Sequence, residues 1–293
     1  MIHVIINPIS GAGADPDAAT RRTELVAAAA RARGVEVVVD VTERKGHAAE
    51  LGARAVAAGA DGVIVWGGDG TFNEAAGALV GSTIPVGLVP AGSGNGLARA
   101  LGMPWDPAAA LRVAFDGVPR AIDAGRMAGR CFFNIGGIGF DARVAALFNL
   151  RAKGTRGGWP YIAIGVREGC RYCALDYDVR LDDDERHCRA LIIAFANGRE
   201  YGLGARIAPD ARLDDGLLDA IIVEERGVLA RFWDARHLAK GTAHLAPMVT
   251  TRKVRRATVA CAGEMEFHVD GEPGRATGRI EVEVIPGALV IRT

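Results

Sequence analysis

The stretch VIVWGGDGTFNEAAGAL runs from Val63 to Leu79, and a second glycine-rich stretch, PAGSGN, runs from Pro90 to Asn95. In both, a short apolar run rich in β-branched residues gives way to a helical pattern. In an α/β protein, this junction between strand and helix is where backbone amides bind anions. Two such turns, about twenty residues apart, therefore predict a site for a polyphosphate.

The turn Gly67-Gly68-Asp69-Gly70-Thr71 has the composition of a phosphate-binding loop. Its glycines permit positive φ angles and a close approach of the backbone to a ligand. Neither the Walker A pattern nor GxGxxG occurs, so amides, hydroxyls and a metal ion would hold the phosphates without a P-loop lysine. Asp69 is costly beside a phosphate unless it binds a cation or accepts a proton. The alternative is that Thr71 and Glu74 form a capping box around a simple tight turn.

The sequence around this turn predicts two domains. Residues 1–120 alternate between strand and helix patterns, which is typical of a parallel sheet with helices on its faces. Residues 121–293 contain short apolar β-rich runs and predict an antiparallel β domain with an inserted helical piece around Ala142–Gly169 and another excursion around Trp233–His244. The strands and helices expected in the first domain are Val4–Ile6, Ala18–Arg33, Val35–Val41, Ala48–Ala58, Val63–Trp66, Thr71–Val80, Val86–Val89 and Gly96–Leu101. The strands expected in the second are Phe132–Ile135, Tyr177–Leu181, Ala190–Ala196, Leu217–Val223, Thr258–Ala260, Glu266–Val269 and Ile280–Ile285.

The composition narrows the function classes. The 293 residues include 35 Lys+Arg and 35 Asp+Glu, a formal net charge of zero, which argues against a protein that binds nucleic acid through bulk electrostatics. The strand pattern directly after Met1 leaves no room for a signal peptide, and no apolar run is long enough for a transmembrane helix. Five cysteines without such a signal favour reduced thiols in the cytoplasm.

The segments GGDGTFNE and VPAGSGNGLARALG resemble the catalytic domain of the family of diacylglycerol kinases, sphingosine kinases and bacterial YegS-like lipid kinases. The resemblance covers nearly the whole chain, because further motifs follow in the family's order. These motifs are Asn7–Gly11 (NPISG), Phe133–Asp141 (FNIGGIGFD), Ala196–Gly198 (ANG), Ala208–Asp219 (APDARLDDGLLD) and Val269–Pro273 (VDGEP).

The resemblance implies transfer of a phosphoryl group from ATP to a lipid hydroxyl, with Mg²⁺. It implies a Rossmann-like nucleotide-binding domain, a β-sandwich-like C-terminal domain and an active site in the cleft between them. Glu272 matches the proton acceptor of bacterial members, and Asp69 matches that of sphingosine-kinase-like members. Asp270, which shares a turn with Glu272, is a third candidate catalytic carboxylate. A structural magnesium is implied at Asp215, helped by the backbone carbonyls of Arg212 and Leu217. The residues implied to line the nucleotide are Asn7, Ser10, Thr42, Gly67, Gly68, Asp69, Gly70, Thr71, Asn73, Ser93 and Asn95.

Several alternatives stay open on the sequence. Asp270-Gly271-Glu272 also fits an ordinary hairpin turn, and Asp214-Asp215-Gly216 also fits a solvated turn. The second loop has Ser93 and Gly96 where diacylglycerol-kinase-like members commonly read GTxND, which leaves the lipid acceptor undetermined, diacylglycerol-like or sphingoid. An NAD kinase is the first rival function. A catalytically weak regulator that binds lipid or nucleotide is the second.

Two features concern metals and membranes. Cys170 and Cys173 form a CxxC without the second pair that a zinc site needs, so structural or incidental thiols are expected. The basic run Arg252–Arg256 predicts a solvated face, or alternatively a patch that holds the protein on an anionic membrane. The segment Ala142–Tyr161 is a second candidate for lipid contact. The expected partners are ATP and a lipid; peripheral contact at the inner membrane face and a homodimer are open alternatives.

Overall fold

The computed structural model describes residues 1–11, 17–151, 164–165, 167–169, 171–202, 205–225, 227, 242, 246 and 248–293. Within these, the chain forms two compact units. The first unit comprises Met1–Ile122 and Gly287–Thr293, and the second comprises Asp123–Pro286. Residues 152–163 and 166 of the helical piece expected around Ala142–Gly169, and nearly all of the excursion expected around Trp233–His244, lie outside the described residues.

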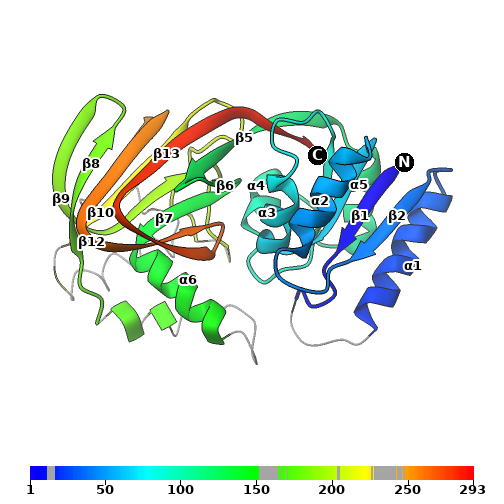
Figure 1. The fold of residues 1–293 in the computed structure, drawn as a ribbon, viewed down its shortest axis with the longest axis horizontal. Helices are drawn as coiled ribbons and strands as arrows, with labels where there is room; N and C mark the ends of the chain where they lie inside the picture. Colours follow the sequence, from blue (N-terminus) through cyan, green and yellow to red (C-terminus); the bar gives the residue numbers. More distant parts are fainter. Residues whose placement is uncertain are drawn as a thin grey trace. The chain divides into compact units, whose positions relative to one another are not determined.

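The first unit is an α/β domain built on a parallel sheet (Figure 1). The strand order is β4-β3-β1-β2, and the C-terminal end of β13 (Glu272–Arg292) adds a strand beside β4, where Ile291 pairs with Val86 in parallel. This matches the predicted fold class. The elements are β1 (Ile2–Ile6), α1 (Ala18–Arg31), β2 (Val37–Val41), α2 (His47–Ala57), β3 (Gly62–Gly67), α3 (Asp69–Gly77), β4 (Val86–Pro90), α4 (Gly96–Leu101) and α5 (Pro107–Asp116).

Helices cover both faces of this sheet, because its central strands are buried along their whole length and are apolar apart from His3. All five residues of β1 and all six of β3 are buried, as expected where helices pack on each side. One face of β1 and β3, with Ile2, Val4, Ile6, Ile64 and Trp66, packs against α1 and α5. Helices α2 and α3 contact each other, with α2 against β1 and α3 against β3.

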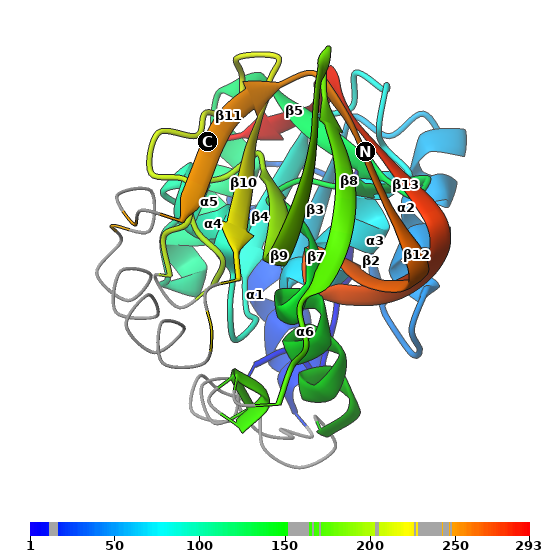
Figure 2. The same cartoon turned by 90° about the vertical axis from the view of Figure 1, so that its left-hand side faces the viewer.

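The second unit is an antiparallel β domain (Figure 2). Long strands are shared between neighbours: the first half of β9 pairs with β8 and the second half with β7, and β12 is divided between the same two strands. The elements are β5 (Pro119–Met127), which begins in the first unit, β6 (Arg130–Phe132), β7 (Ile135–Gly139), α6 (Phe140–Arg151), β8 (Leu175–Leu181), β9 (Asp184–Ala196), β10 (Leu218–Glu224), β11 (Val249–Val254), β12 (Arg256–Val269) and β13.

The core of this unit lies on one side of the sheet, around large side chains such as Phe132, Tyr177, Phe195 and Phe267. A smaller cluster packs the segment from Ile207 to Ala211 against β7, β9 and β10, which fixes the start of the loop that carries Asp215. The three short strands expected between residues 258 and 285 are parts of one long hairpin, β12–β13. The sequence pattern suggests separate strands because a register shift and the exposed residues Ala262, Gly263 and Glu264 interrupt the apolar alternation there.

The last residues of the chain belong to the first unit, whereas the sequence placed them in the second domain. Thr293 and Val118 exchange backbone hydrogen bonds, N to O at 3.1 and 3.3 Å, and Ile291 lies fully buried beside β4. A domain boundary predicted from local sequence patterns cannot detect that the last residues of the chain pair with the first unit. The expected boundary at residue 120 is two residues from the division after Ile122.

Candidate active site

The first unit gathers the ends of its parallel strands at one edge of the sheet. Backbone hydrogen bonds continue the ladder beyond the strands: Asn7 N donates to Trp66 O at 2.9 Å, Thr42 N to Ile6 O at 2.8 Å, and Ala91 N to Gly67 O at 2.9 Å. The loops after all four strands therefore lie side by side. The chain order reverses between β1 and β3, and ligands of open α/β sheets bind at the carboxyl ends of the strands at such a point.

The two glycine-rich turns are in direct contact at this edge. A Cβ atom on Gly92 would lie 2.6 Å from the Gly68 Cα, and one on Gly68 would lie 2.9 Å from the Gly92 Cα. Gly68 has φ −92° and ψ −177°, which any residue adopts. The requirement for glycine at Gly68 therefore comes from the neighbouring loop and not from backbone strain.

We expect Gly92→Ala to weaken nucleotide binding and stability together. The new methyl group would lie 2.6 Å from Gly68 and 2.8 Å from the Asn95 Oδ1, and overpacking of this kind costs about 1–3 kcal/mol. The two loops would have to separate, so the affinity for ATP, the nucleotide predicted from the sequence, should fall about tenfold or more. Calorimetric titration with ATP and thermal unfolding measure the two effects.

The matched control is Gly77→Ala at the end of α3, where no heavy atom lies within 4 Å of the added Cβ. It should leave ATP affinity unchanged and stability equal or slightly higher. If Gly92→Ala behaved like this control, the contact between the loops would have no role in binding.

Asn7 connects the loop after β1 to the start of α3. Its Nδ2 donates to the Thr71 Oγ1 at 2.7 Å, and its Oδ1 accepts from Ile9 N at 3.1 Å. The Ser10 hydroxyl donates to the Asn7 carbonyl at 2.8 Å. The predicted nucleotide residues Asn7, Ser10 and Thr71 are thus brought together, although they come from separate segments of the sequence.

The capping box considered for Thr71 and Glu74 is not formed. The helix begins at Asp69 with Gly68 as its N-cap, and no side chain caps it. Glu74 instead accepts a hydrogen bond from Gly46 N, at 3.0 Å from its Oε1. The capping-box prediction was wrong because the N-cap of α3 is Gly68, three residues before Thr71.

The remaining predicted nucleotide residues lie on the same strand ends and loops. Asp69 is half-exposed in the first turn of α3, and its Oδ1 lies 3.4 Å from Leu97 N. Asn95 is buried, and its backbone has the left-handed conformation with φ 50°. Its Oδ1 accepts from Gly92 N and its Nδ2 donates to Gly92 O, both at 2.7 Å. Asn95 therefore holds the shape of the second loop. Thr42, Gly70, Asn73 and Ser93 are half-buried, and Gly67 ends β3.

In the second unit, Asp270 and Gly271 form a two-residue turn between β12 and β13. Both have positive φ, 48° and 84°, and the flanking residues Val269 and Glu272 pair across the strands. This is the geometry of a type I′ hairpin, so the hairpin alternative is confirmed. A hairpin turn can still carry a catalytic group. The carboxylates of Asp270 and Glu272 have different surroundings.

The Asp270 carboxylate is an acceptor for three consecutive backbone amides. Its Oδ2 accepts from Phe133 N at 2.8 Å, and its Oδ1 accepts from Asn134 N and Ile135 N, both at 3.0 Å. This arrangement gives Asp270 a structural role in joining the hairpin to the start of β7. It makes Asp270 the weakest of the three candidate catalytic carboxylates.

Glu272 is half-exposed at the first position of β13, and the turn before it is fixed by neighbours. Gly271 N donates to the His268 Nδ1 at 3.2 Å, and the Gly271 carbonyl accepts from the Asn149 Nδ2 at 3.1 Å. The His268 Nε2 lies 3.2 Å from the Asp141 Oδ2, and both side chains are buried. His268 must therefore carry its proton on Nε2 when it is neutral, which leaves Nδ1 as the acceptor for Gly271.

Sequence reasoning missed this pair. Tyr201 also donates to the Asp141 Oδ2, at 2.8 Å, and a Cβ on Gly137 would lie 2.0 Å from that oxygen and 2.7 Å from the His268 Nε2. Asp141 and Gly137 lie in the motif Phe133–Asp141, whereas His268 was not among the residues predicted from the sequence. Its position directly before the motif Val269–Pro273 was the available signal.

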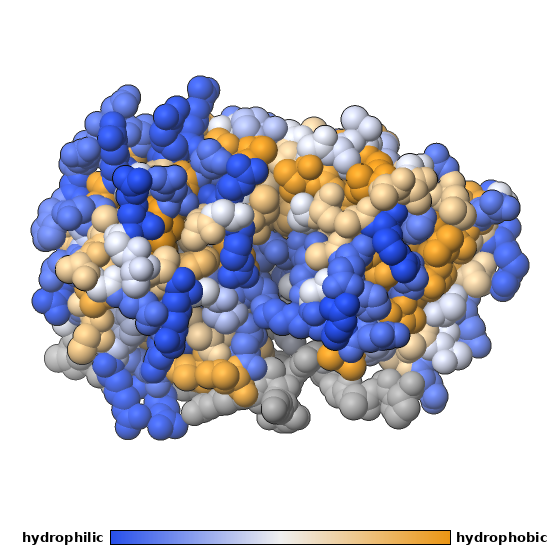
Figure 3. Space-filling model, in the orientation of Figure 1, coloured by the Kyte–Doolittle hydropathy of each residue, from blue (hydrophilic) through white to orange (hydrophobic). Residues whose placement is uncertain are grey.

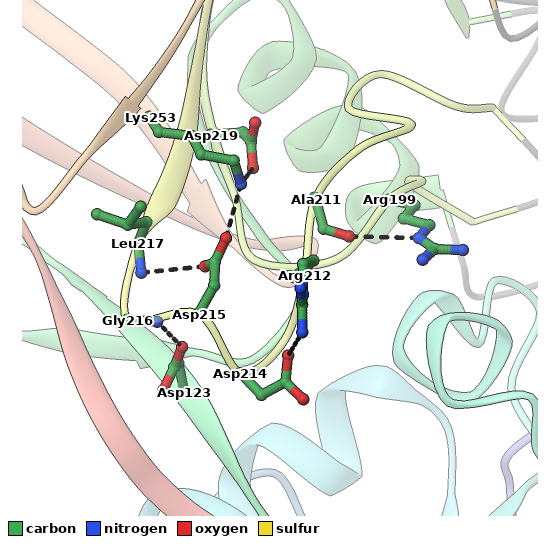
Figure 4. A network of polar contacts seen from close by, with 10 residues as sticks. All are labelled: Asp123, Arg199, Ala211, Arg212, Asp214, Asp215, Gly216, Leu217, Asp219 and Lys253. Atoms are coloured by element: carbon green, nitrogen blue, oxygen red, sulfur yellow. Dashed lines mark hydrogen bonds and ion pairs between the residues drawn. The ribbon is translucent and has the colours of Figure 1, made fainter.

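The predicted metal residues lie in the loop before β10, where a lysine already neutralises the carboxylate (Figure 4). Lys253 Nζ donates to the Asp215 Oδ2 at 2.8 Å and to the Asp219 Oδ2 at 3.1 Å, while the Asp215 Oδ1 accepts from Leu217 N at 3.2 Å. Lys253 on β11 is the direct cross-strand partner of Asp219 on β10. The strand register therefore places the Lys253 ammonium beside the loop that carries Asp215.

The residues present do not fit a divalent cation here. Burial by itself lowers the pKa of Lys253, but the hydrogen bonds to Asp215 and Asp219 outweigh it, so the pKa lies above its usual value. A charged ammonium on the Asp215 oxygen would repel Mg²⁺, and the Arg212 guanidinium beside Asp214, at 3.4 Å, adds positive charge.

We therefore expect the stability of the protein to be independent of divalent metal. Its melting temperature should be the same in millimolar Mg²⁺ and in EDTA. Lys253→Met should lower stability by about 1–2 kcal/mol, because it leaves the buried Asp219 without its charged partner, and Mg²⁺ or Ca²⁺ should restore part of that loss.

Arg252→Met is the matched control, since Arg252 precedes Lys253 on β11 and pairs with the exposed Asp184. It should show no response to metal. Stabilisation of the unaltered protein by Mg²⁺, abolished by Asp215→Asn, would instead establish a metal site at Asp215.

The basic run Arg252–Arg256 is partly engaged within the protein. Within Arg252–Arg256, Arg252 and Lys253 pair with carboxylates and Val254 is buried. On the face drawn in Figure 3, hydrophilic and hydrophobic residues are intermixed. Among the helices that the structure describes, none is long and apolar enough to cross a membrane. Cys170, Trp159 and Tyr161 lie outside the described residues.

Two family models match the chain in succession. Residues 1–127 match the diacylglycerol kinase catalytic domain, and residues 135–293 match the YegS C-terminal NAD kinase beta sandwich-like domain. The second match alone covers more than half of the chain.

Curated relatives carry names of the same kind. A diacylglycerol kinase of Mycobacterium tuberculosis (strain ATCC 25618 / H37Rv) is 34% identical over 99% of this chain and 94% of its own length. A protein of Chromohalobacter salexigens named "Probable lipid kinase YegS-like" is 36% identical, over 66% of this chain and 63% of that relative. A protein of the same name from Pseudomonas aeruginosa (strain PAO1) is 33% identical over 89% of this chain and 86% of its own.

Solved structures share the fold. The crystal structure of a diacylglycerol kinase from Bacillus anthracis str. Sterne superposes with a TM-score of 0.75 at 20% identity, covering 99% of this chain and 96% of that one. A further crystal structure from the same organism gives a TM-score of 0.81 at 23% identity, covering 99% and 94%. These similarities show the architecture of an α/β domain followed by a β-sandwich-like domain.

Proposed function

The chain belongs to the family of diacylglycerol kinases and YegS-like lipid kinases, and we propose that it transfers the γ-phosphate of ATP to a hydroxyl group of a lipid. The observation that carries this proposal is the contact between its two glycine-rich turns. Gly68 and Gly92 touch at the carboxyl edge of the parallel sheet, beside the hydrogen bond from Asn7 to Thr71. This arrangement suits a phosphate chain that runs across several loops.

The proposal assigns nucleotide binding to the first unit. Asn7, Ser10 and Thr71 supply polar groups around the loop after β1, and the amides of the Gly68–Thr71 turn lie at the positive end of α3. The chain has no P-loop lysine. Mg²⁺ bound with ATP would neutralise charge that develops on the phosphates.

Proton acceptance from the lipid hydroxyl is assigned to Glu272. Asp270 is unsuited because three backbone amides occupy its oxygens. Glu272 is half-exposed, and its turn is held by His268 and Asn149. Phosphoryl transfer requires a positioned hydroxyl and a carboxylate near it. Asp69, half-exposed at the start of α3, is the alternative acceptor.

The acceptor lipid is proposed to be diacylglycerol-like, with a sphingoid base as the alternative. Because a lipid of either kind lies in a membrane, the enzyme would act at a membrane surface, from the cytoplasmic side. A curated relative from Mycobacterium tuberculosis is named diacylglycerol kinase, which favours the glycerolipid.

A single assay separates the candidate functions. Purified protein is given ATP and Mg²⁺ with vesicles that contain diacylglycerol, with sphingosine or with NAD, and ATP consumption and phosphorylated products are followed. Phosphatidic acid formation is expected. Phosphorylation of NAD alone would make the protein an NAD kinase. Tight ATP binding without turnover of any lipid would favour a regulator, and lipid extracts of overexpressing cells would check for an acceptor outside this set.

A further inference from the structure

Arg22 on α1 reaches the loop that follows β1. Its Nη1 donates to the Ser10 Oγ at 2.8 Å and also to the Asn7 carbonyl, and its Nη2 donates to the Ser10 carbonyl at 3.0 Å. The guanidinium lies over the ring of Trp66, with its carbon 5.7 Å from the ring centroid. Arg22 is therefore held against the two residues expected to line the nucleotide at this loop.

The charge of Arg22 has no negative partner among the described residues. All the acceptors of its hydrogen bonds are neutral oxygens of Asn7 and Ser10. Burial lowers the pKa of Arg22, and the neighbouring charge of Arg21 lowers it further. Among the described residues this half-buried guanidinium has no compensating carboxylate, and burial strengthens its attraction for an incoming negative charge, so it can act as a binding element for an anion.

The donors that remain suit a phosphate. A guanidinium has five N–H groups, and the contacts above use both N–H groups of Nη1 and one of Nη2. The other Nη2 donor and the Nε donor are available, and arginine binds phosphate oxygens through such paired donors.

We propose that Arg22 binds the β- or γ-phosphate of the nucleotide and supplies the positive charge that a P-loop lysine supplies to these phosphates elsewhere. This inference rests on the proposed function, since it takes the ligand of the loop to be ATP. The competing explanation is that Arg22 only holds the loop in shape. The two differ in one respect: a phosphate contact depends on the charge of the ligand, whereas a loop support does not.

The test compares Arg22→Gln with Arg21→Gln, a matched control at the adjacent exposed position of the same helix. Calorimetric titrations with ATP, ADP and AMP are made on each protein. Arg22→Gln should weaken ATP binding about 10- to 100-fold, with smaller losses for ADP and AMP. Arg21→Gln should change each affinity by less than about twofold. An equal loss for all three nucleotides would assign Arg22 to loop support and overturn the proposal.

A second measurement uses the unaltered protein and does not depend on the folding of a variant. Phenylglyoxal modifies accessible arginines, and peptide mass spectrometry gives the rate at each one. ATP should slow the modification of Arg22 and leave that of Arg21 unchanged. Unchanged labelling of Arg22 with ATP bound would overturn the inference alone. Failure of the unaltered protein to bind ATP would overturn the proposed function as well, so the two failures are distinguishable.

Discussion

Glu272→Gln is expected to lower the rate of lipid phosphorylation by about 10²–10⁴, the usual contribution of a general base. Glutamine keeps the shape of the side chain but cannot accept a proton from the substrate hydroxyl. Initial rates measured with ATP and the lipid identified in the substrate assay give the loss. ATP affinity and the melting temperature should stay close to those of the unaltered protein, because Glu272 is half-exposed.

Asp69→Asn is the companion variant that decides between the two acceptors. If Asp69→Asn abolishes turnover while Glu272→Gln leaves it within a few-fold, Asp69 is the proton acceptor. If both variants keep their rates within a few-fold, neither carboxylate accepts the proton and the assignment fails.

Asp270→Ala is expected to be the most destabilising single change discussed here. It removes the acceptor of three amides, and two of these belong to Phe133 and Ile135, which are almost completely buried. A buried donor left without a partner costs about 1–3 kcal/mol, so these two donors imply a loss of about 2–6 kcal/mol. Alanine also tolerates the φ of 48° at this position less well than aspartate does. Urea unfolding followed by circular dichroism measures the loss.

Two variants of the same turn act as controls. Glu272→Gln should change the free energy of unfolding by less than about 1 kcal/mol. The free energy of unfolding of Asp270→Asn should lie between those of Asp270→Ala and Glu272→Gln. The Oδ1 of the asparagine can still accept hydrogen bonds, whereas its Nδ2 amide group would face a backbone N–H donor. If Asp270→Ala unfolded like Glu272→Gln, the Asp270 carboxylate would not be what joins the hairpin to β7.

Local patterns of the sequence were sufficient for the fold class. Alternating strand and helix patterns before residue 120 predicted the parallel sheet, and short β-rich runs after it predicted the antiparallel domain. The two glycine-rich turns were identified because the strand and helix beside each lie within a few residues of it. Asp69, Thr71, Asn95 and Glu272 were found for the same reason, as members of short motifs.

Roles that depend on distant partners were not predictable. Gly68 was read as a source of backbone freedom, but its φ is ordinary and its neighbour is Gly92. Asp270 was weighed as a catalytic group, while its partners lie more than 130 residues earlier. Lys253 was one charge of a basic run, and only the pairing with Asp219 on β10 places it at Asp215.

The sequence by itself determined the elements, their order and the two phosphate-type turns. The physical reason is that helix and strand periodicity and turn chemistry depend on residues a few positions apart. Only the tertiary structure decided which polar groups form the site and which hold it together. Hydrogen bonds, steric contacts and ion pairs act over a few ångströms, and folding brings Asn7 to Thr71, Arg22 to Ser10, and Asp270 to Ile135.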